Sequence, residues 1–407
     1  MFENKANVIS AARSVLSSRL DDSSGTITTP IELDFCVEVA KSILLMSSIL
    51  YERDQEFVER AFEGTEEARL NLLRSEEKLL KAAADWNCQF TSIAHSQTAK
   101  GPFVGAFFDL EARPNPFMVI VFKGTSFHDI NEWIVDTSFN FEACADQLGA
   151  GLAHQGFYSS LFPSASDREM PSTYLRTIET IRSVAKHIHE EAGIPMNLFV
   201  GGHSFGAGIA SLFYARLLES PEDIGPHTIL RDAYCFGTPR GGDSSLASRV
   251  EYNLAKPINF KRCLWTVGNR SASTRLGDII PHLPPGLADQ RRFRTAIASG
   301  SSLSYAAIGT PIDLEPRGKL PLYRFRSIRC GTRLKVLKLS NSPDQHIQEL
   351  CLNAKDDDLL FNLQQPSLDD HFFWLNGCFQ TLLPFIHDHL PGSYLSSMNK
   401  ISHTNFT

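Results

Sequence analysis

The sequence predicts an α/β fold built from parallel βαβ units, and three observations support this. From Pro116 onward, short runs rich in β-branched and aromatic residues alternate with longer segments of helical periodicity. Such alternation is typical of parallel strands joined by crossover helices. A serine between two glycines stands where one strand gives way to a helix, and the chain is long enough to bury a large core. The predicted strands cover 118–122, 197–200, 233–236 and 258–267, and the predicted helices lie near 172–191 and 207–218.

The composition is that of a globular protein whose partners are small or neutral. The 407 residues are 43% hydrophobic and 21% charged, so disorder is not expected. A formal net charge of -7 gives no electrostatic basis for binding nucleic acid or an anionic membrane surface. We therefore expect no nucleic-acid partner.

Targeting signals and cysteines indicate an intracellular protein. No apolar run is long enough for a signal peptide or for a transmembrane helix, which needs about 18 residues. The eight cysteines are scattered, without a CxxC pair, and most have apolar neighbours, so buried thiols are favoured over disulfides. The sequence thus predicts a cytoplasmic protein, or a secreted one if a leader is missing from the chain.

The predicted organisation is one domain behind a flexible start. Residues 1–30 are expected to be flexible, and 31–400 to form a single domain. Within it, 31–100 is predicted to be mainly helical, with the segment that contains Leu33, Val37 and Ile43 forming one helix. The region of about 286–380 is expected to hold a late strand, in "LSYAAIGTPIDL", and an insertion.

The segment Gly202-His203-Ser204-Phe205-Gly206 matches the G-x-S-x-G pattern of a nucleophile elbow. Its place between a predicted strand and a predicted helix is the context that the elbow requires. An abrupt strand-to-helix turn strains the serine, and Cβ atoms two positions away on either side would collide, which explains the glycines. The turn exposes the hydroxyl at a helix N-terminus, where the backbone N–H of Phe205 would donate to a developing oxyanion. An ordinary Gly/Ser turn is the alternative.

Four ordered blocks make the chain resemble the class 3 lipase family, the fungal-type lipases of the α/β-hydrolase fold. The blocks are "VIVFKGTSFHDINEWIVDTSF", "AHQGFYSSL", "GGHSFGAG", and "FGTPRGGD" leading to "GDIIPHLPP". The resemblance covers roughly residues 35–400. It implies an α/β-hydrolase fold with a mostly parallel central sheet, preceded here by a helical N-terminal extension.

The first block implies the second oxyanion donor and a lid. In the family the residue after the glycine of this block supplies the donor, which here is Thr125. Residues 127–133 correspond to the lid, although Trp133 fits a core aromatic equally well. The chain departs from the family pattern in having Lys123 where arginine is commoner, and in a longer spacing from Gly124 to Trp133.

The resemblance implies that Asp278 is the acid of a catalytic triad, because it matches the D-x-V-P-x-L-P block of the family. A triad acid fixes the tautomer of the histidine base. Asp232 and Asp243 are rivals that are more simply explained as surface carboxylates.

The chain order of this fold, serine then acid then histidine, confines the base to histidines after Asp278. The candidates are His282, His346, His371, His387, His389 and His403. His389 is favoured because "HDHLPGSYLSSM" resembles the way in which one fungal branch presents its histidine. His282 is interpreted as a structural or pocket-rim residue, and Pro391 indicates that His389 enters on a loop.

These residues predict hydrolysis of lipid esters by an acylglycerol lipase-like serine esterase. Ser204, activated by His389, would attack the ester carbonyl, and water would release the acyl group, with no metal or organic cofactor. The expected partner is a lipid or other ester, with transient contact at a lipid–water interface. Two alternatives stay open: a small-ester or phospholipid acyl hydrolase with the same triad, and a catalytically silent scaffold that binds lipid.

Overall fold

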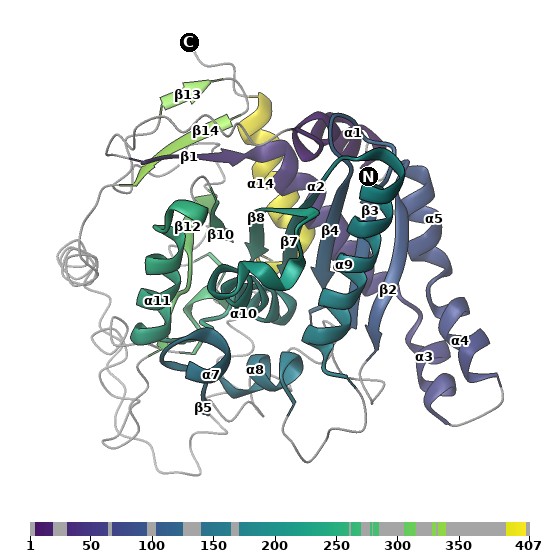
Figure 1. Ribbon diagram of the computed structural model, residues 1–407, viewed down its shortest axis with the longest axis horizontal. Helices are drawn as coiled ribbons and strands as arrows, with labels where there is room; N and C mark the ends of the chain where they lie inside the picture. Colours follow the sequence, from purple (N-terminus) through teal and green to yellow (C-terminus); the bar gives the residue numbers. More distant parts are fainter. Residues whose placement is uncertain are drawn as a thin grey trace.

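A seven-stranded sheet forms the centre of the computed structural model (Figure 1). The structure describes residues 5–18, 31–63, 67–95, 103–124, 140–163, 171–259, 262–269, 277–278, 280–284, 305–314, 328–330, 333–338 and 388–403. In spatial order, the strands of the sheet are β12 (Thr310–Leu314), β10 (Leu264–Asn269), β8 (Thr228–Phe236), β7 (Met196–His203), β4 (Phe117–Phe122), β3 (Phe103–Asp109) and β2 (Gln89–His95). Neighbouring strands from β4 to β12 are parallel, and β3 is antiparallel to both its neighbours.

The strands and helices predicted from Pro116 onward are present. β4, β7 and β8 extend the three predicted strands by a few residues, and the late strand is β12. The fourth predicted strand is shorter than expected, because Pro257 begins a 3-10 turn and β10 starts only at Leu264. The two predicted helices are α9 (Thr173–Ala192) and α10 (Phe205–Glu219).

Alternation along each strand divides the core between the two faces of the sheet. In β4, Phe117, Val119 and Val121 pack on one face, and Met118 and Ile120 pack on the other. Successive side chains of a strand point to opposite faces, so a strand covered on both sides is apolar throughout. The first face is covered by α1, α2, α5 and α14, and the second by α8, α9, α10 and α11.

The N-terminal part is helical but includes one unpredicted strand. Its helices are α1 (Lys5–Leu16), α2 (Val37–Ile49), the 3-10 turn η1 (Leu50–Glu52), α3 (Gln55–Phe62), α4 (Ala68–Ser75) and α5 (Glu77–Asp85). The helix predicted to include Leu33 begins only at Val37, because β1 (Ile31–Cys36) pairs antiparallel with β14 (Arg333–Lys338). Strand β13 (Ile328–Cys330) completes this second sheet. Because β14 lies about 300 residues after β1 in the chain, no local sequence pattern predicts that the two strands pair.

The predicted flexible start differs from the structure over residues 5–18. Helix α1 buries Ile9, Ala12 and Leu16 against α2. Its end is held by the side-chain amide of Asn197, which donates to the Leu16 carbonyl at 2.8 Å. The apolar stripe of α1 therefore belongs to the core.

A small sheet, short helices and 3-10 turns make up the remaining described elements. A small antiparallel sheet is formed by β5 (Phe141–Ala143), β6 (Leu152–His154), β9 (Gly242–Asp243) and β11 (Tyr305–Ala306). The helices are α7 (Ala145–Leu148), α8 (Gln155–Leu161), α11 (Ser244–Leu254) and α14 (Pro391–His403), with 3-10 turns η3 (Pro221–Ile224), η4 (Pro257–Asn259) and η5 (Ile280–His282). Cys36, Cys88, Cys144, Cys235 and Cys263 are buried free thiols, as the sequence predicts.

Candidate active site

Ser204 occupies the sharp turn between β7 and α10, which confirms the predicted strand–turn–helix context. Its backbone has φ 59° and ψ -131°. Asn87 and Ser204 are the two non-glycine residues with positive φ in the described part of the chain. A serine pays a conformational cost there and stays only where its surroundings enforce the turn. The Ser204 N–H donates to the Phe236 carbonyl at 2.9 Å, which ties the turn to the end of β8.

The glycines on either side of Ser204 are required by close backbone contacts. A Cβ on Gly202 would lie 2.5 Å from the Gly206 carbonyl oxygen, and one on Gly206 would lie 2.1 Å from the Phe122 carbonyl oxygen. Both distances are far below van der Waals contact, so any larger residue would push α10 away from the sheet. These contacts confirm the expectation that Cβ atoms at the two glycines would collide with the backbone.

Asp278 and His389 form a buried pair next to this turn. His389 Nδ1 and Asp278 Oδ2 are 2.8 Å apart, and the side chains are 2% and 0% exposed. The Tyr394 hydroxyl also donates to Asp278 Oδ2, at 2.5 Å, and the Ile280 N–H donates to Oδ1 at 2.9 Å. Burial alone would raise the pKa of Asp278, but the charge and hydrogen bonds of His389, Tyr394 and Ile280 outweigh it and lower that pKa.

The partners of His389 define its tautomer. An ionised carboxylate only accepts hydrogen bonds, so Nδ1 carries the proton and Nε2 keeps a lone pair. Nε2 is buried and has no hydrogen-bond partner among the described residues. The prediction that His389 enters on a loop is wrong, because Asp388 and His389 are helical and Pro391 begins α14. Proline is tolerated in the first turn of a helix.

His203, the residue before Ser204, links the serine turn to His389. Its Nε2 lies 2.7 Å from the His389 carbonyl oxygen, so it must donate there, and the two rings are 4.6 Å apart. Its Nδ1 then accepts from the Tyr51 hydroxyl at 2.9 Å. Tyr51 also forms a hydrogen bond with the Gly124 backbone. Burial, and then the nearby charge of His389, lowers the pKa of His203 to about 3, so the ring is neutral.

Gly237 brings Ser204, Asp278 and His389 into one region. It follows Phe236, which accepts the Ser204 N–H. A Cβ on Gly237 would lie 2.6 Å from His389 Cε1 and 2.9 Å from Asp278 Oδ2. One short stretch of backbone at the end of β8 thus contacts all three predicted residues.

Several of the other predicted site residues are not described by the structure. Thr125, the proposed lid at 127–133 and the histidines His346, His371 and His387 lie outside the described residues. Gly124, which precedes Thr125, is described, and its Cα packs on the Tyr51 hydroxyl and the His203 carbonyl.

The rival acids have structural partners. Asp243 caps α11 by accepting the Leu246 N–H at 2.9 Å. Asp232 accepts from the Cys263 N–H at 2.9 Å and from the Trp265 indole at 3.1 Å. His282 is half-buried in η5, four residues after Asp278.

Tyr51 and Tyr394 are site residues that the sequence did not single out. They contact residues 152 and 116 positions away in the chain, so no local pattern connects them to the site. Tyr394 belongs to the sequence block on which the choice of His389 was based, and this was the available signal for its presence in the site.

His154 lies close to the other side of the serine turn. Its Nδ1 accepts the Gly156 N–H at 3.1 Å, which caps α8, and its ring stacks on Phe157 with centroids 4.3 Å apart. Phe157 in turn contacts Phe205, the residue after Ser204, at 5.0 Å. Burial lowers the pKa of His154 to about 4, so this histidine is also neutral in the folded protein.

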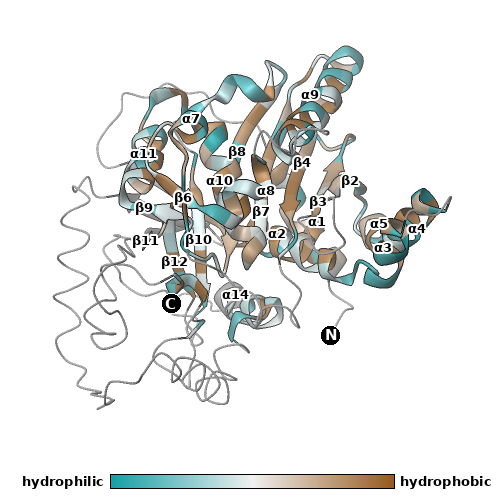
Figure 2. Cartoon of the chain, turned by 90° about the horizontal axis from the view of Figure 1, so that it is seen from below, coloured by the Kyte–Doolittle hydropathy of each residue, from teal (hydrophilic) through white to brown (hydrophobic). Residues whose placement is uncertain are grey.

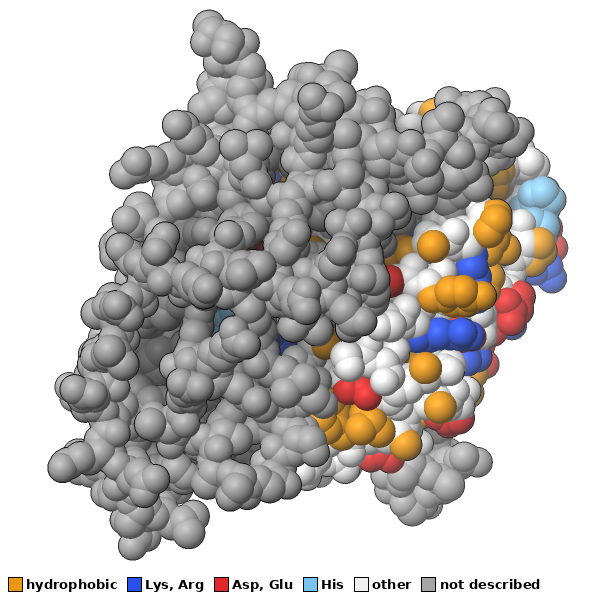
Figure 3. All heavy atoms as spheres, turned by 90° about the vertical axis from the view of Figure 1, so that its left-hand side faces the viewer, with side chains coloured by type: hydrophobic (Ala, Val, Ile, Leu, Met, Phe, Trp, Pro, Cys, Tyr) orange, Lys and Arg blue, Asp and Glu red, His pale blue; other side chains and the backbone are white. Residues whose placement is uncertain are grey.

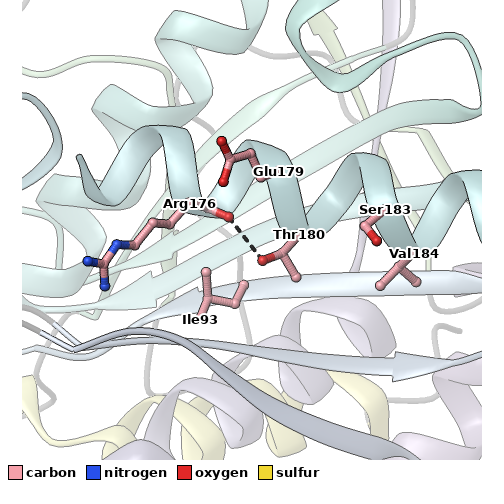
Figure 4. Close-up of a pocket in the computed structure, with 6 residues that line it drawn as sticks. All are labelled: Ile93, Arg176, Glu179, Thr180, Ser183 and Val184. Atoms are coloured by element: carbon pink, nitrogen blue, oxygen red, sulfur yellow. Dashed lines mark hydrogen bonds between the residues drawn. The ribbon is translucent and has the colours of Figure 1, made fainter. Parts of the chain in front are cut away.

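A surface groove of about 420 Å³ lies between β2 and α9 (Figure 4). It is lined by Ile93, Arg176, Glu179, Thr180, Ser183 and Val184. The Thr180 hydroxyl donates back to the Arg176 carbonyl of its own helix at 2.9 Å, and none of the predicted site residues lines the groove. No group of three or more metal-ligating side chains occurs within the described ranges.

The fold and the serine turn define an α/β hydrolase. The sequence model of the family described as "Lipase (class 3)" matches residues 119–287 of the chain. This match supports a serine ester hydrolase of the lipase type. No curated protein matches the chain.

Solved structures with a similar fold include three fungal proteins. The Rhizomucor miehei lipase propeptide complex is 15% identical, with 81% of this chain and 84% of that chain covered and a TM-score of 0.43. A lipase from Rhizopus microsporus var. chinensis is 16% identical, with 74% and 82% covered and a TM-score of 0.40. A mutant form of MDLA from Penicillium cyclopium is 16% identical, with 80% and 92% covered and a TM-score of 0.39.

The first prediction concerns Tyr51. Replacing Tyr51→Phe removes the donor to His203 Nδ1 and leaves this buried nitrogen unpaired. We expect the free energy of unfolding, measured in urea, to fall by about 1–3 kcal/mol. The exposed Tyr252→Phe is the matched control and should change it by less than about 0.5 kcal/mol. Equal values for the two variants would contradict the hydrogen bond.

The second prediction concerns pH. The pKa of His154 is lower in the folded than in the unfolded chain, so unfolding takes up a proton and stability falls as pH drops from about 6.5 toward 4. An asparagine at this position would not titrate, and its side-chain oxygen would still cap Gly156. In His154→Asn, the loss of unfolding free energy between about pH 7 and about pH 5 should be smaller by about 2 kcal/mol. Parallel pH profiles for the two proteins would show that His154 is not neutral when folded.

Proposed function

We propose that the chain hydrolyses carboxylic esters of lipids with Ser204 as nucleophile, His389 as general base and Asp278 as the acid that orients the base. The observation that carries the proposal is the state of His389. Its Nδ1 is held by Asp278 at 2.8 Å, whereas its Nε2 is buried and without a hydrogen-bond partner among the described residues. A general base requires an unprotonated nitrogen that is shielded from water and lies near the nucleophile.

The contacts around His203 support the proposed alignment of serine and base. The serine and His203 are consecutive, and His203 holds the backbone carbonyl of His389 at 2.7 Å. The position of the base is thereby coupled directly to the residue that precedes the nucleophile. Tyr394 adds a second donor to Asp278, which keeps the carboxylate ionised and facing His389.

In the proposed reaction, His389 Nε2 takes the Ser204 Oγ proton as Oγ forms a bond with the ester carbonyl carbon. The electron pair of the carbonyl moves to its oxygen, which accepts hydrogen bonds from the backbone N–H of Phe205 and from Thr125. Collapse of this intermediate breaks the bond to the alcohol, which leaves with the proton from His389. A water molecule then attacks the acyl-enzyme by the same sequence of steps and releases the acid.

The role of Thr125 is supported by its neighbour. Gly124 packs on the His203 carbonyl so closely that a Cβ would lie 2.6 Å away. Gly124, which directly precedes the proposed donor in the chain, therefore lies next to the serine turn. The lid at 127–133 and the cytoplasmic location remain predictions of the sequence.

We also propose that residues 31–400 act as one domain. The two apolar clusters lie on the two faces of the same sheet, and α14, near the end of the chain, packs on α2, near its beginning. None of the described helices is long and apolar enough to span a membrane.

The third prediction tests the nucleophile. A fluorophosphonate probe should label the protein at one site, and Ser204→Ala should abolish both labelling and the hydrolysis of an emulsified triacylglycerol. An exposed serine, Ser159→Ala, serves as the control and should leave both unchanged. Labelling that persists in Ser204→Ala would place the nucleophile elsewhere.

The fourth prediction tests the base and acid. His389→Ala and Asp278→Asn should each reduce kcat by about 10⁴-fold or more, the asparagine by leaving the imidazole in the wrong tautomer. The double variant should be scarcely worse than either single one, because triad members act as a unit. His387→Ala is the control in the same segment and should retain activity. A His389→Ala variant that keeps its activity would assign the role of general base to another histidine.

A further inference from the structure

Exposed apolar side chains concentrate on the helices between η1 and β2. Eight large apolar side chains are exposed among the described residues. Half of them lie between residues 62 and 80: Phe62, Leu70, Leu73 and Leu80, which are 41%, 43%, 53% and 42% exposed. Both views place α3 and α4 at the outer end of the sheet, beyond β2 (Figures 1 and 2).

Helix α4 presents its leucines to the outside and its polar residues to the protein. Asn71 and Ser75 are 6% and 1% exposed, whereas Leu70 and Leu73 are exposed. Successive residues of a helix are rotated by about 100°, so one side of α4 carries, in order around the helix, Arg69, Leu73, Leu70 and Arg74. We call these four residues the α4 outer face.

Hydrogen bonds fix α4 in this orientation. The Asp54 N–H donates to the Ser75 carbonyl at 3.0 Å, and Arg53 Nε donates to the Ser75 hydroxyl at 3.2 Å. The Arg53 guanidinium lies 3.6 Å from Glu76 and 4.0 Å from the centre of the Phe103 ring. Rolling the helix to bury its leucines would leave the buried Arg53 without these partners, so the outer face is held outward.

The α4 outer face has the composition of a lipid-surface contact. Residues 68–75 contain two arginines and no acid. Neither Arg69 nor Arg74 has an ion pair among the described residues, and Arg74 lies 5.9 Å over the Phe57 ring. Guanidinium groups pair with phosphate, and their stems run along apolar surface, so two leucines between two arginines match the boundary between headgroups and acyl chains.

The α4 outer face is connected to the serine turn by a short path. Arg53, which anchors α4, is two residues from Tyr51, and the Tyr51 hydroxyl binds His203 Nδ1 at 2.9 Å. A lipid surface bound at α4 would therefore be held at a fixed position relative to the candidate active site.

We propose that the α4 outer face docks the protein on a phospholipid surface, with Leu70 and Leu73 among the acyl chains and with Arg69 and Arg74 on headgroup phosphates. The proposal rests on the proposed lipid-ester hydrolysis and names the surface on which it takes place. The net charge of the chain does not oppose it, because salt screens charges more than about 10 Å away.

The test is binding to vesicles in the Ser204→Ala background, so that lipid is not consumed. Phosphatidylcholine vesicles are sedimented with the protein, and the partition coefficient is measured. Leu70→Glu/Leu73→Glu should lower it by at least about 10-fold. The control is Tyr252→Glu/Ile258→Glu, on positions around α11 that are 60% and 59% exposed, and it should leave the partition coefficient unchanged. Figure 3 views the side of the molecule on which α11 lies, and hydrophobic and charged side chains are interspersed over its described part.

A second variant tests the arginines. Arg69→Gln/Arg74→Gln should lower binding to phosphatidylcholine vesicles by at least about 3-fold. It should not change binding to vesicles of digalactosyldiacylglycerol, which has no phosphate. Equal losses on both lipids would contradict the phosphate contact.

The outcomes separate this proposal from the proposed function. With the serine restored, Leu70→Glu/Leu73→Glu should hydrolyse a soluble short-chain ester at the rate of the parent, and lose activity only on lipid held in vesicles. Unchanged vesicle binding, or an equal loss in the control, would overturn the docking surface. A parent that is dimeric by gel filtration and becomes monomeric in the leucine variant would assign the face to a second copy instead. Vesicle binding without any ester hydrolysis would contradict the proposed function alone.

Discussion

The arrangement of the site depends on how closely the backbone approaches itself around Ser204. Because Gly206 carries no Cβ, α10 starts directly against the Phe122 carbonyl, and because Gly202 carries none, the end of β7 lies directly against the Gly206 carbonyl. Between these two contacts the serine is forced to φ 59°. The sheet then holds the turn through the hydrogen bond from Ser204 to Phe236. The helix that follows is almost wholly buried, so it has no freedom to relax the turn. Strain at one residue is thus maintained by the packing of the second face of the sheet.

Around this turn the structure uses neutral and charged groups for different purposes. His203 and His154 are buried, and burial keeps both neutral, so they serve as a fixed donor and a fixed acceptor for backbone groups. Asp278 is buried as well, but three donors compensate for its lost hydration and lower its pKa. The difference lies in the number of hydrogen-bond donors, because a buried carboxylate that accepts several hydrogen bonds stays ionised.

Local sequence patterns predicted the parts of the fold and site that are local in the chain. The strand, turn and helix around Ser204 fall within one stretch, so spacing and periodicity suffice to identify them. Asp278 and His389 were assigned through family resemblance, since nothing in either segment alone indicates that they meet. Tyr51 and strand β1 were missed or misassigned because their partners, His203 and β14, lie far away in the chain. Pairing over such distances is settled by tertiary packing, which overrides local propensity.

The position of α14 has a consequence for how the protein is made. Tyr394 binds Asp278, Ser397 binds Asn269 at 2.8 Å, and His389 lies just before this helix, near the end of the chain. During synthesis the serine turn and its sheet emerge long before these residues do. A nascent chain would therefore carry Ser204, the proposed nucleophile, without His389, the proposed base, until α14 has also been synthesised. Over this interval the serine turn would lack the partners that are proposed to activate it.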